Sequence, residues 1–103
     1  MARTPRSAIG DVVYHILNRA NGREQIFKEE KDYQDFEKIL FEAKEKYSMR
    51  ILSFCIMPNH WHLILYPKTG EDLSSFMRWI THTHTQRYHV KYKSIGYGPF
   101  SRN

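Results

Sequence analysis

Hydrophobic residues recur along the first half of the chain in two different rhythms. Residues 12–17 are rich in β-branched and aromatic side chains, which favour a strand. After a turn at Asn21-Gly22, the apolar positions of 31–47 are spaced by three and four residues. This spacing forms one stripe and predicts an amphipathic helix over 31–47, with Asp32 as its candidate N-cap.

The second half of the chain begins with an almost continuous apolar stretch, 49–57, which is apolar on both sides. This pattern predicts a central strand that is partly covered on both faces. One side is expected to carry Leu52, Phe54 and Ile56, and the other Ile51, Cys55 and Met57. Pro58-Asn59 predicts a tight turn into a further strand, 60–66. So short a link requires the two strands to pair antiparallel.

A second helix is predicted from Asp72, which is its candidate cap. Its inner stripe is expected to comprise Leu73, Phe76, Met77, Ile80, His84 and Tyr88. Gly96, Gly98 and Pro99 end regular structure. The order strand, helix, strand, strand, helix predicts an α+β fold of the ferredoxin-like βαββα(β) type, with an antiparallel sheet of three strands and the helices on one face. The last strand, and any helix after it, are expected to be absent.

Composition and length indicate one domain over 1–103, with an extended arm at 1–10. The chain has 103 residues, 41% of them hydrophobic, which allows one modest core. No apolar stretch suits a secretory signal or a membrane span. The single cysteine, Cys55, cannot form an internal disulfide, and a reducing cytoplasm is the simplest compartment for it.

Charge favours a polyanionic partner. Sixteen Lys and Arg residues against eleven Asp and Glu give a net charge of +5. Neutralising phosphates releases counterions and stabilises such a complex. The acids crowd into 24–45, whereas 68–103 is basic apart from Glu71 and Asp72. The distribution points to a nucleic acid at the C-terminal half, although a merely soluble basic protein would have the same net charge.

The candidate chemistry lies in His60-Trp61-His62. Side chains alternate faces along a strand, so His60 and His62 point the same way, roughly 6.5–7 Å apart. Two imidazoles at that separation can ligate one divalent cation, with a third ligand from elsewhere. The alternative is a pair of strand histidines bonded to ordinary partners. His15, in the first strand, is interpreted as structural rather than as a ligand.

Residues 57–65 closely resemble the HUH motif (histidine, hydrophobic residue, histidine) of REP-associated tyrosine transposases and single-strand insertion-sequence transposases. Three further segments look like the same family in order and spacing, and together they extend the resemblance over 12–100. They are Val13-Tyr14-His15 with Asn18-Arg19, then Arg23-Glu24-x-Ile26-Phe27, and Phe76-Met77-Arg78-Trp79.

The resemblance implies a mechanism. His60 and His62 would be the metal ligands and catalytic residues, holding Mg²⁺ or Mn²⁺ with a third side chain from a C-terminal helix. A tyrosine on that helix would attack the scissile phosphate of single-stranded DNA. In the family a strand and this helix follow the segment resembling 95–100. Only three residues follow here, so the nucleophile is expected to be missing. Tyr88, more readily a core residue, and Tyr92 are weak local substitutes.

The expected function is a transposase-type HUH endonuclease domain that binds single-stranded or hairpin DNA and is catalytically incomplete. The alternative is a non-catalytic nucleic-acid-binding module, and a zinc hydrolase ranks last. An uncovered sheet edge suggests a homodimer.

His82, His84 and His89 could form a second metal site, but they are more typical of a solvent-exposed helix face. Candidate DNA-binding residues are Arg19, Arg23, Arg78 and Arg87, with Lys91 and Lys93 along the backbone and Trp79 or Tyr97 for base stacking; a solvated face explains them equally well.

Overall fold

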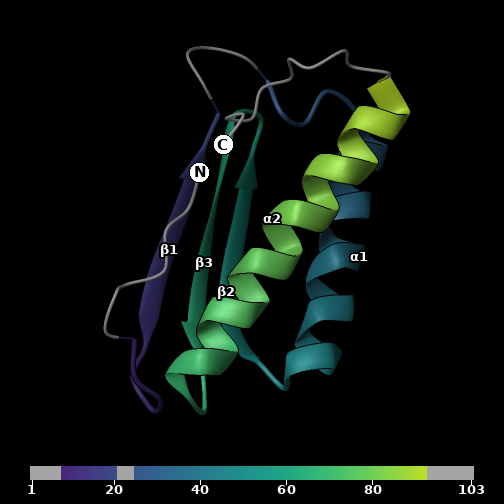
Figure 1. Cartoon of the computed structure of the whole chain (residues 1–103). Helices are drawn as coiled ribbons and strands as arrows, with labels where there is room; N and C mark the ends of the chain where they lie inside the picture. The colour runs from purple at the N-terminus through teal and green to yellow at the C-terminus, as the bar shows by residue number, and fades with distance from the viewer. Residues whose placement is uncertain (1–7, 21–24, 93–103) are drawn as a thin grey trace.

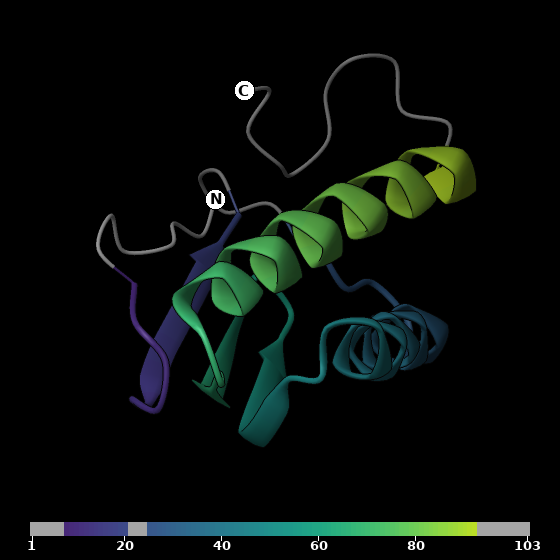
Figure 2. The same cartoon turned by 60° about the horizontal axis from the view of Figure 1, so that its bottom comes forward.

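The computed structural model describes residues 8–20 and 25–92. They form five elements: β1 (Tyr14–Arg19), α1 (Glu30–Tyr47), β2 (Arg50–Met57), β3 (His60–Tyr66) and α2 (Gly70–Tyr92). The three strands make one antiparallel sheet in the order β1-β3-β2. Both helices cover the same face of this sheet, and the described residues leave its other face open (Figures 1 and 2). The α+β fold with a three-stranded antiparallel sheet is confirmed.

Several expectations fall on residues outside the described part of the chain. They are the arm up to residue 7, the Asn21-Gly22 turn, Arg23, Lys93, Tyr97 and the segment 95–100. Among the residues that are described, no helix is both long enough and apolar enough to cross a membrane.

The core lies between the sheet and the two helices. The central strand β3 sends Trp61, Leu63 and Leu65 into it, and all three are fully buried. Opposite them lie fully buried residues of both helices, which include Phe36, Ile39, Leu73, Phe76 and Ile80. The stripes of both helices face inward as the periodicity predicted. Removing this apolar surface from water is the main term that holds the layers together.

The expectation that 49–57 forms the central strand is wrong. β3 is central, because β1 and β2 pair with its two sides, and β2 is an edge strand with mostly exposed side chains. A register shift between Ile51 and Ser53 also changes the faces. Beyond it Phe54 pairs with Leu63 on the helix side, and Leu52 is 55% exposed. A bulge adds one residue to one strand, which strict alternation cannot anticipate.

Both helices begin two or more residues earlier than the caps proposed from the sequence. Glu29 is the N-cap of α1, and Asp32 is the third helical residue of a capping box. The Asp32 carboxylate accepts hydrogen bonds from the backbone N–H groups of Lys28 (2.8 Å) and Glu29 (3.2 Å). At α2, the Asp72 N–H donates to Thr69 Oγ1 at 3.0 Å. The first turns are polar, so apolar periodicity does not mark them.

The chain entering β1 packs closely against the start of α2. A Cβ atom on Gly10 would lie 1.8 Å from the carbonyl oxygen of Lys68, and one on Gly70 would lie 1.9 Å from that of Ala8. Only glycine allows two backbones to approach so closely. The Asp11 N–H also donates to the Pro67 carbonyl at 2.8 Å. The end of the expected arm is therefore docked onto the domain.

His84 is a histidine of the core. Only 6% of its surface is exposed, and its ring lies 5.5 Å from that of Phe27 and 4.7 Å from that of Phe36. Burial lowers the pKa of His84 to about 4, against the opposing effect of the carboxylates of Asp32 and Asp35. Burial disfavours the charged imidazole because it removes the ring from water.

We expect His84 to make the fold acid-sensitive. Its pKa is lower in the folded chain than in the unfolded chain, so the unfolded state binds more protons between pH 6.5 and 4. The free energy of unfolding should therefore fall as the pH falls through that window, by up to about 3 kcal/mol. Denaturant unfolding of the wild type and of His84→Leu at pH 7 and pH 4.5 measures this. The loss should be smaller in His84→Leu and unchanged in His82→Leu, which alters an exposed histidine. Equal losses in all three proteins would contradict the assignment.

Candidate metal and nucleic-acid site

His60 and His62 lie on the open face of the sheet. They alternate along β3 with the buried Trp61 and Leu63, so both imidazoles stand opposite the helices. Their ring centroids are 5.0 Å apart. The structure thus places both rings on the same side of the strand, as the alternation predicts. They are also close enough to act on a shared ligand.

The turn before His60 is anchored by the loop that precedes α1. The Pro58 carbonyl accepts hydrogen bonds from the N–H groups of Ile26 (2.7 Å) and Phe27 (3.0 Å), and the Asn59 carbonyl accepts one from Ala20 (2.9 Å). The side chains of Ile26 and Phe27 are buried in the core. The position of His60 is therefore fixed by packing that begins far from it in the sequence.

Each of the two histidines is bonded at its Nδ1 atom. His60 Nδ1 lies 2.7 Å from Asn59 Oδ1, and His62 Nδ1 lies 3.1 Å from Nε2 of His15. Within the described residues, neither Nε2 atom has a hydrogen-bond partner. Both rings can therefore present Nε2 to a cation. Sequence reasoning missed Asn59, and it placed His15 in a structural role without locating its contact.

The surroundings of His60 disfavour its charged form. Partial burial lowers the pKa of His60, and the positive charge of Arg19 and the neighbouring His62 lower it further. Arg19 lies directly opposite His60 in the pairing of β1 with β3. A neutral imidazole has the lone pair that binds a metal ion, so the lowered pKa favours cation binding near neutral pH.

The donor set fits a divalent cation held by two imidazoles. Among the described residues, no group of three or more His, Cys, Asp or Glu side chains could hold a metal ion. His60 and His62 would therefore supply two nitrogen ligands, and further ligands would come from water, from a substrate or from another segment. Two imidazoles alone would leave the remaining coordination positions open to such ligands.

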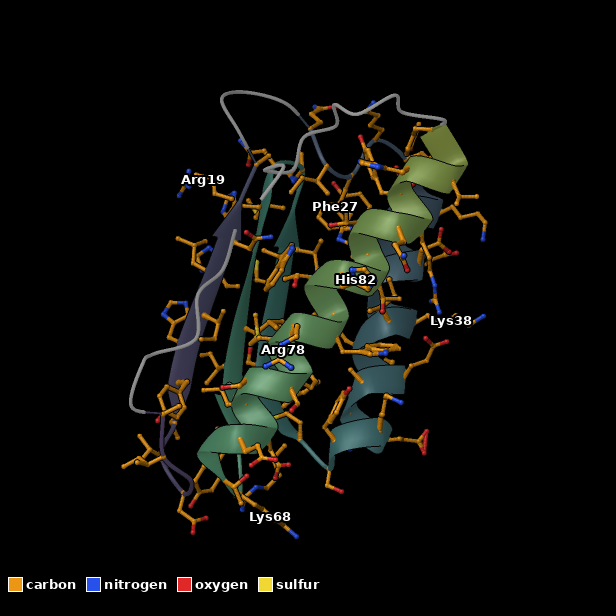
Figure 3. The ribbon with its side chains drawn as sticks, viewed as in Figure 1. Arg19, Phe27, Lys38, Lys68, Arg78 and His82 are labelled. Carbon is orange, nitrogen blue, oxygen red and sulfur yellow. The ribbon has the colours of Figure 1, made fainter. Side chains whose placement is uncertain are left out.

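The structure does not place all four candidate DNA-binding arginines near His60 and His62. Arg19 is exposed at the end of β1 on the open face, whereas Arg78 is exposed on α2, in the helix layer (Figure 3). Arg87 is also on α2, where it forms an ion pair with Glu42 at 3.1 Å. Arg23 lies outside the described residues. Only Arg19 among the described three lies beside the histidines.

The two tyrosines considered as substitutes for a nucleophile lie in the helix layer. Tyr88 is 6% exposed, and its ring centroid is 4.7 Å from that of Tyr92. The Tyr92 hydroxyl donates to Asp32, and burial together with this hydrogen bond raises the pKa of Tyr92 to about 12. Both side chains are separated from His60 and His62 by the sheet. The structure does not bring either tyrosine to the site.

The same hydrogen bonds keep Asp32 charged. Its burial would raise the pKa, but hydrogen bonds from Lys91, Tyr92 and two backbone N–H groups outweigh this and lower the pKa of Asp32 to about 2. The Lys91 ammonium lies 2.6 Å from Asp32, which ties the end of α2 to the start of α1. Lys91 is therefore engaged in the fold.

The histidines of α2 do not gather into a second metal site, because His82 is exposed and His84 is in the core.

Charge is distributed unequally between the two faces. The three strands carry no acidic residue, and their open face carries Arg19 and three histidines, together with Arg50, which is paired with Asp11 at 3.3 Å. Helix α1, on the opposite layer, has six acidic residues and four lysines. A polyanion would accordingly be attracted to the sheet face more than to the helix α1 face.

Comparison with known proteins assigns the fold. The sequence model of the family described as "Transposase IS200 like" matches residues 8–100. A REP-associated tyrosine transposase bound to a REP hairpin superposes with a TM-score of 0.68 at 22% identity, over 84% of this chain and 53% of that one. A candidate transposase from Deinococcus radiodurans R1 superposes with a TM-score of 0.66 at 16% identity, over 88% of this chain and 69% of that one. A search of curated protein sequences found no match. The chain thus spans about half the length of the first of these structures.

Proposed function

The chain belongs to the IS200-like transposase family, and from that premise we propose that its open sheet face binds single-stranded or hairpin DNA together with Mg²⁺ or Mn²⁺. His60 and His62 hold the cation through Nε2, and the metal-bound face acts on a DNA phosphodiester. The observation that carries this proposal is the pair of imidazoles on one face of β3, each bonded at Nδ1.

Two further observations support DNA as the partner. The open face carries no acidic strand residue, and Arg19 lies opposite His60, where a phosphate beside the cation would meet it. One structure of the same fold is of a transposase bound to a REP hairpin. Salt bridges to phosphate supply most of the affinity for DNA without sequence preference. Arg19 is thus proposed as a phosphate-binding residue and not as a reader of bases.

The family resemblance implies a transesterification at phosphorus, for which the described residues of this chain would supply the cation site and not the nucleophile. His60 and His62 would hold the divalent cation, which when bound would supply Lewis-acid polarisation of the scissile phosphate and offset its charge. A tyrosine oxygen bonds to phosphorus while the bond to the 3′ oxygen breaks, and the tyrosine proton goes to that oxygen. The products are a 5′-phosphotyrosine and a free 3′ hydroxyl. In family members, the tyrosine and a third ligand lie on a helix that follows the segment resembling 95–100. Tyr88 is therefore not proposed as the nucleophile.

The competing function is a nucleic-acid-binding module without catalysis. The two functions differ in whether the cation and the histidines matter. We expect Mn²⁺ to strengthen binding of a hairpin oligonucleotide with single-stranded flanks roughly tenfold or more. His60→Ala and His62→Ala should abolish this increase, whereas His82→Ala should retain it. Fluorescence anisotropy with and without EDTA measures the effect. Binding that neither the chelator nor His60→Ala changes would support the module instead.

The role of Arg19 can be separated from that of net charge. Arg19→Ala should weaken binding of all sequences alike and reduce the slope of log K against log salt concentration by about 0.7–0.9. Arg87→Ala removes the same charge from a side chain already paired with Glu42 on the helix layer, and should change the slope less. The measurement is anisotropy between 50 and about 200 mM salt. Equal effects of the two substitutions would indicate binding by net charge alone.

We also propose that the chain forms a homodimer through the edge of β2. This strand has β3 on one side, and in the described residues no strand pairs with its other side. Phe41 of α1 and Leu52 and Phe54 of β2 are exposed hydrophobic residues. Together they border a hollow lined by Leu40, Phe41, Lys44, Ile51, Leu52, Ser53 and Phe54. An open edge with apolar side chains suits pairing with a second copy.

Light scattering at micromolar concentration should therefore give twice the mass of the 12.4 kDa chain. Leu52→Lys should shift the protein to monomer, because a charge on an edge strand opposes edge pairing. Leu17→Lys is the matched control, since it places the same charge on β1, the other edge strand. A wild-type monomer, or equal effects of both substitutions, would contradict dimerisation through β2.

A further inference from the structure

His15 makes a contact with the proposed metal site that needs a chemical explanation. It stands on β1, on the open face, and its Nε2 atom lies 3.1 Å from Nδ1 of His62. The residue directly opposite His62 in the pairing is Leu17, so His15 reaches the ring diagonally. The two ring centroids are 5.3 Å apart with the planes 31° from parallel. The contact is therefore a hydrogen bond between rings of adjacent strands.

A neutral imidazole carries one hydrogen, so one ring nitrogen donates and the other accepts. A nitrogen that binds a cation must offer its lone pair, which leaves the hydrogen on the other nitrogen. For His60, the partner of Nδ1 is the amide oxygen of Asn59, which can only accept. The hydrogen of His60 is thereby placed on Nδ1, and its Nε2 has a lone pair.

We infer that His15 does for His62 what Asn59 does for His60: its Nε2 accepts the hydrogen of His62 Nδ1, which leaves the Nε2 lone pair of His62 free for the cation. His15 is then a positioning residue and not a ligand. This inference rests on the proposed function of His60 and His62. It gives β1 a role in the metal site, although β1 lies outside the His-x-His motif.

The arrangement sets the orientation of the His62 ring as well as its hydrogen. Without a partner at Nδ1, the ring can turn about its side-chain bonds, and the hydrogen can move to Nε2, where it blocks the cation. Partners of this kind fix the tautomer and direction of metal-bound histidines, and their removal typically costs 10–100-fold in metal affinity. The effect does not require His15 to touch the ion.

Three substitutions test the inference. His15→Phe keeps a ring of similar shape but has no acceptor. His15→Gln retains an amide oxygen at a comparable reach, so it should restore the bond. His82→Phe makes the same change at an exposed histidine of α2 and is the matched control (Figure 3). Because His15 is exposed on the sheet face, none of these changes opens a cavity in the core.

Isothermal titration with Mn²⁺ in the absence of DNA is the first measurement. His15→Phe should weaken binding about 10–100-fold, and His15→Gln should stay within about threefold of the wild type. His82→Phe should have no effect. An unchanged affinity in folded His15→Phe would overturn the inference.

Nitrogen NMR of the metal-free, ¹⁵N-labelled protein is the second measurement, and its decisive spectrum is that of the wild type. His62 should show a protonated Nδ1 and an unprotonated Nε2 in the wild type, and a mixture of tautomers in His15→Phe. A wild-type His62 that carries its hydrogen on Nε2 would overturn the inference even if the variants failed to fold.

The two proposals can fail separately. If the wild type does not bind Mn²⁺, or if His62→Ala binds it equally well, then His62 is not a ligand and the proposed function fails together with this inference. If His62→Ala loses the ion while His15→Phe keeps it, only the role of His15 is wrong.

Discussion

The alternation of side chains along β3 is the constraint on which the rest of the structure depends. Trp61, Leu63 and Leu65 must be buried against the helices, and a strand can bury only every second residue on one side. The burial of those three side chains therefore forces His60 and His62 to the open face. A shift of one residue in the register of β3 would bury the histidines and expose the core residues. The hydrophobic effect and the proposed chemistry are thus coupled through one strand.

The central place of β3 in the sheet adds to this coupling. It pairs with β1 on one side and with β2 on the other, so side chains from both neighbouring strands can reach its open face. His15 contacts His62 from β1, and the anchored turn from β2 supplies Asn59 to His60. An edge strand could be supported from one side only. The site therefore occupies the strand that offers the most fixed surroundings, which is what orienting two imidazoles requires.

Features with a strong local signal were predictable from the sequence, and those set by distant packing were not. The stripe of α1, the hairpin at Pro58-Asn59 and the shared face of the histidines follow from short-range periodicity, and the structure has all three. The edge position of β2 did not follow, because its apolar composition resembles that of a buried strand and its bulge has no local signal. The support from Asn59 and the contact of His15 also depend on tertiary pairing, which periodicity does not encode.

The same distinction applies to the charged residues. Arg19 and Arg87 are alike in the sequence, yet one lies opposite His60 on the sheet face and the other is paired with Glu42 on the helix layer. Lys91 and Tyr92 are likewise bound to Asp32, where they join the two helices. Basic residues of the C-terminal half thus contribute to the fold as well as to the net charge. A charge count favours a polyanionic partner, but ion pairing within the fold decides which basic side chains remain available to it. Since the strands bear no acid, a phosphate that approached the histidines would meet no strand carboxylate to repel it.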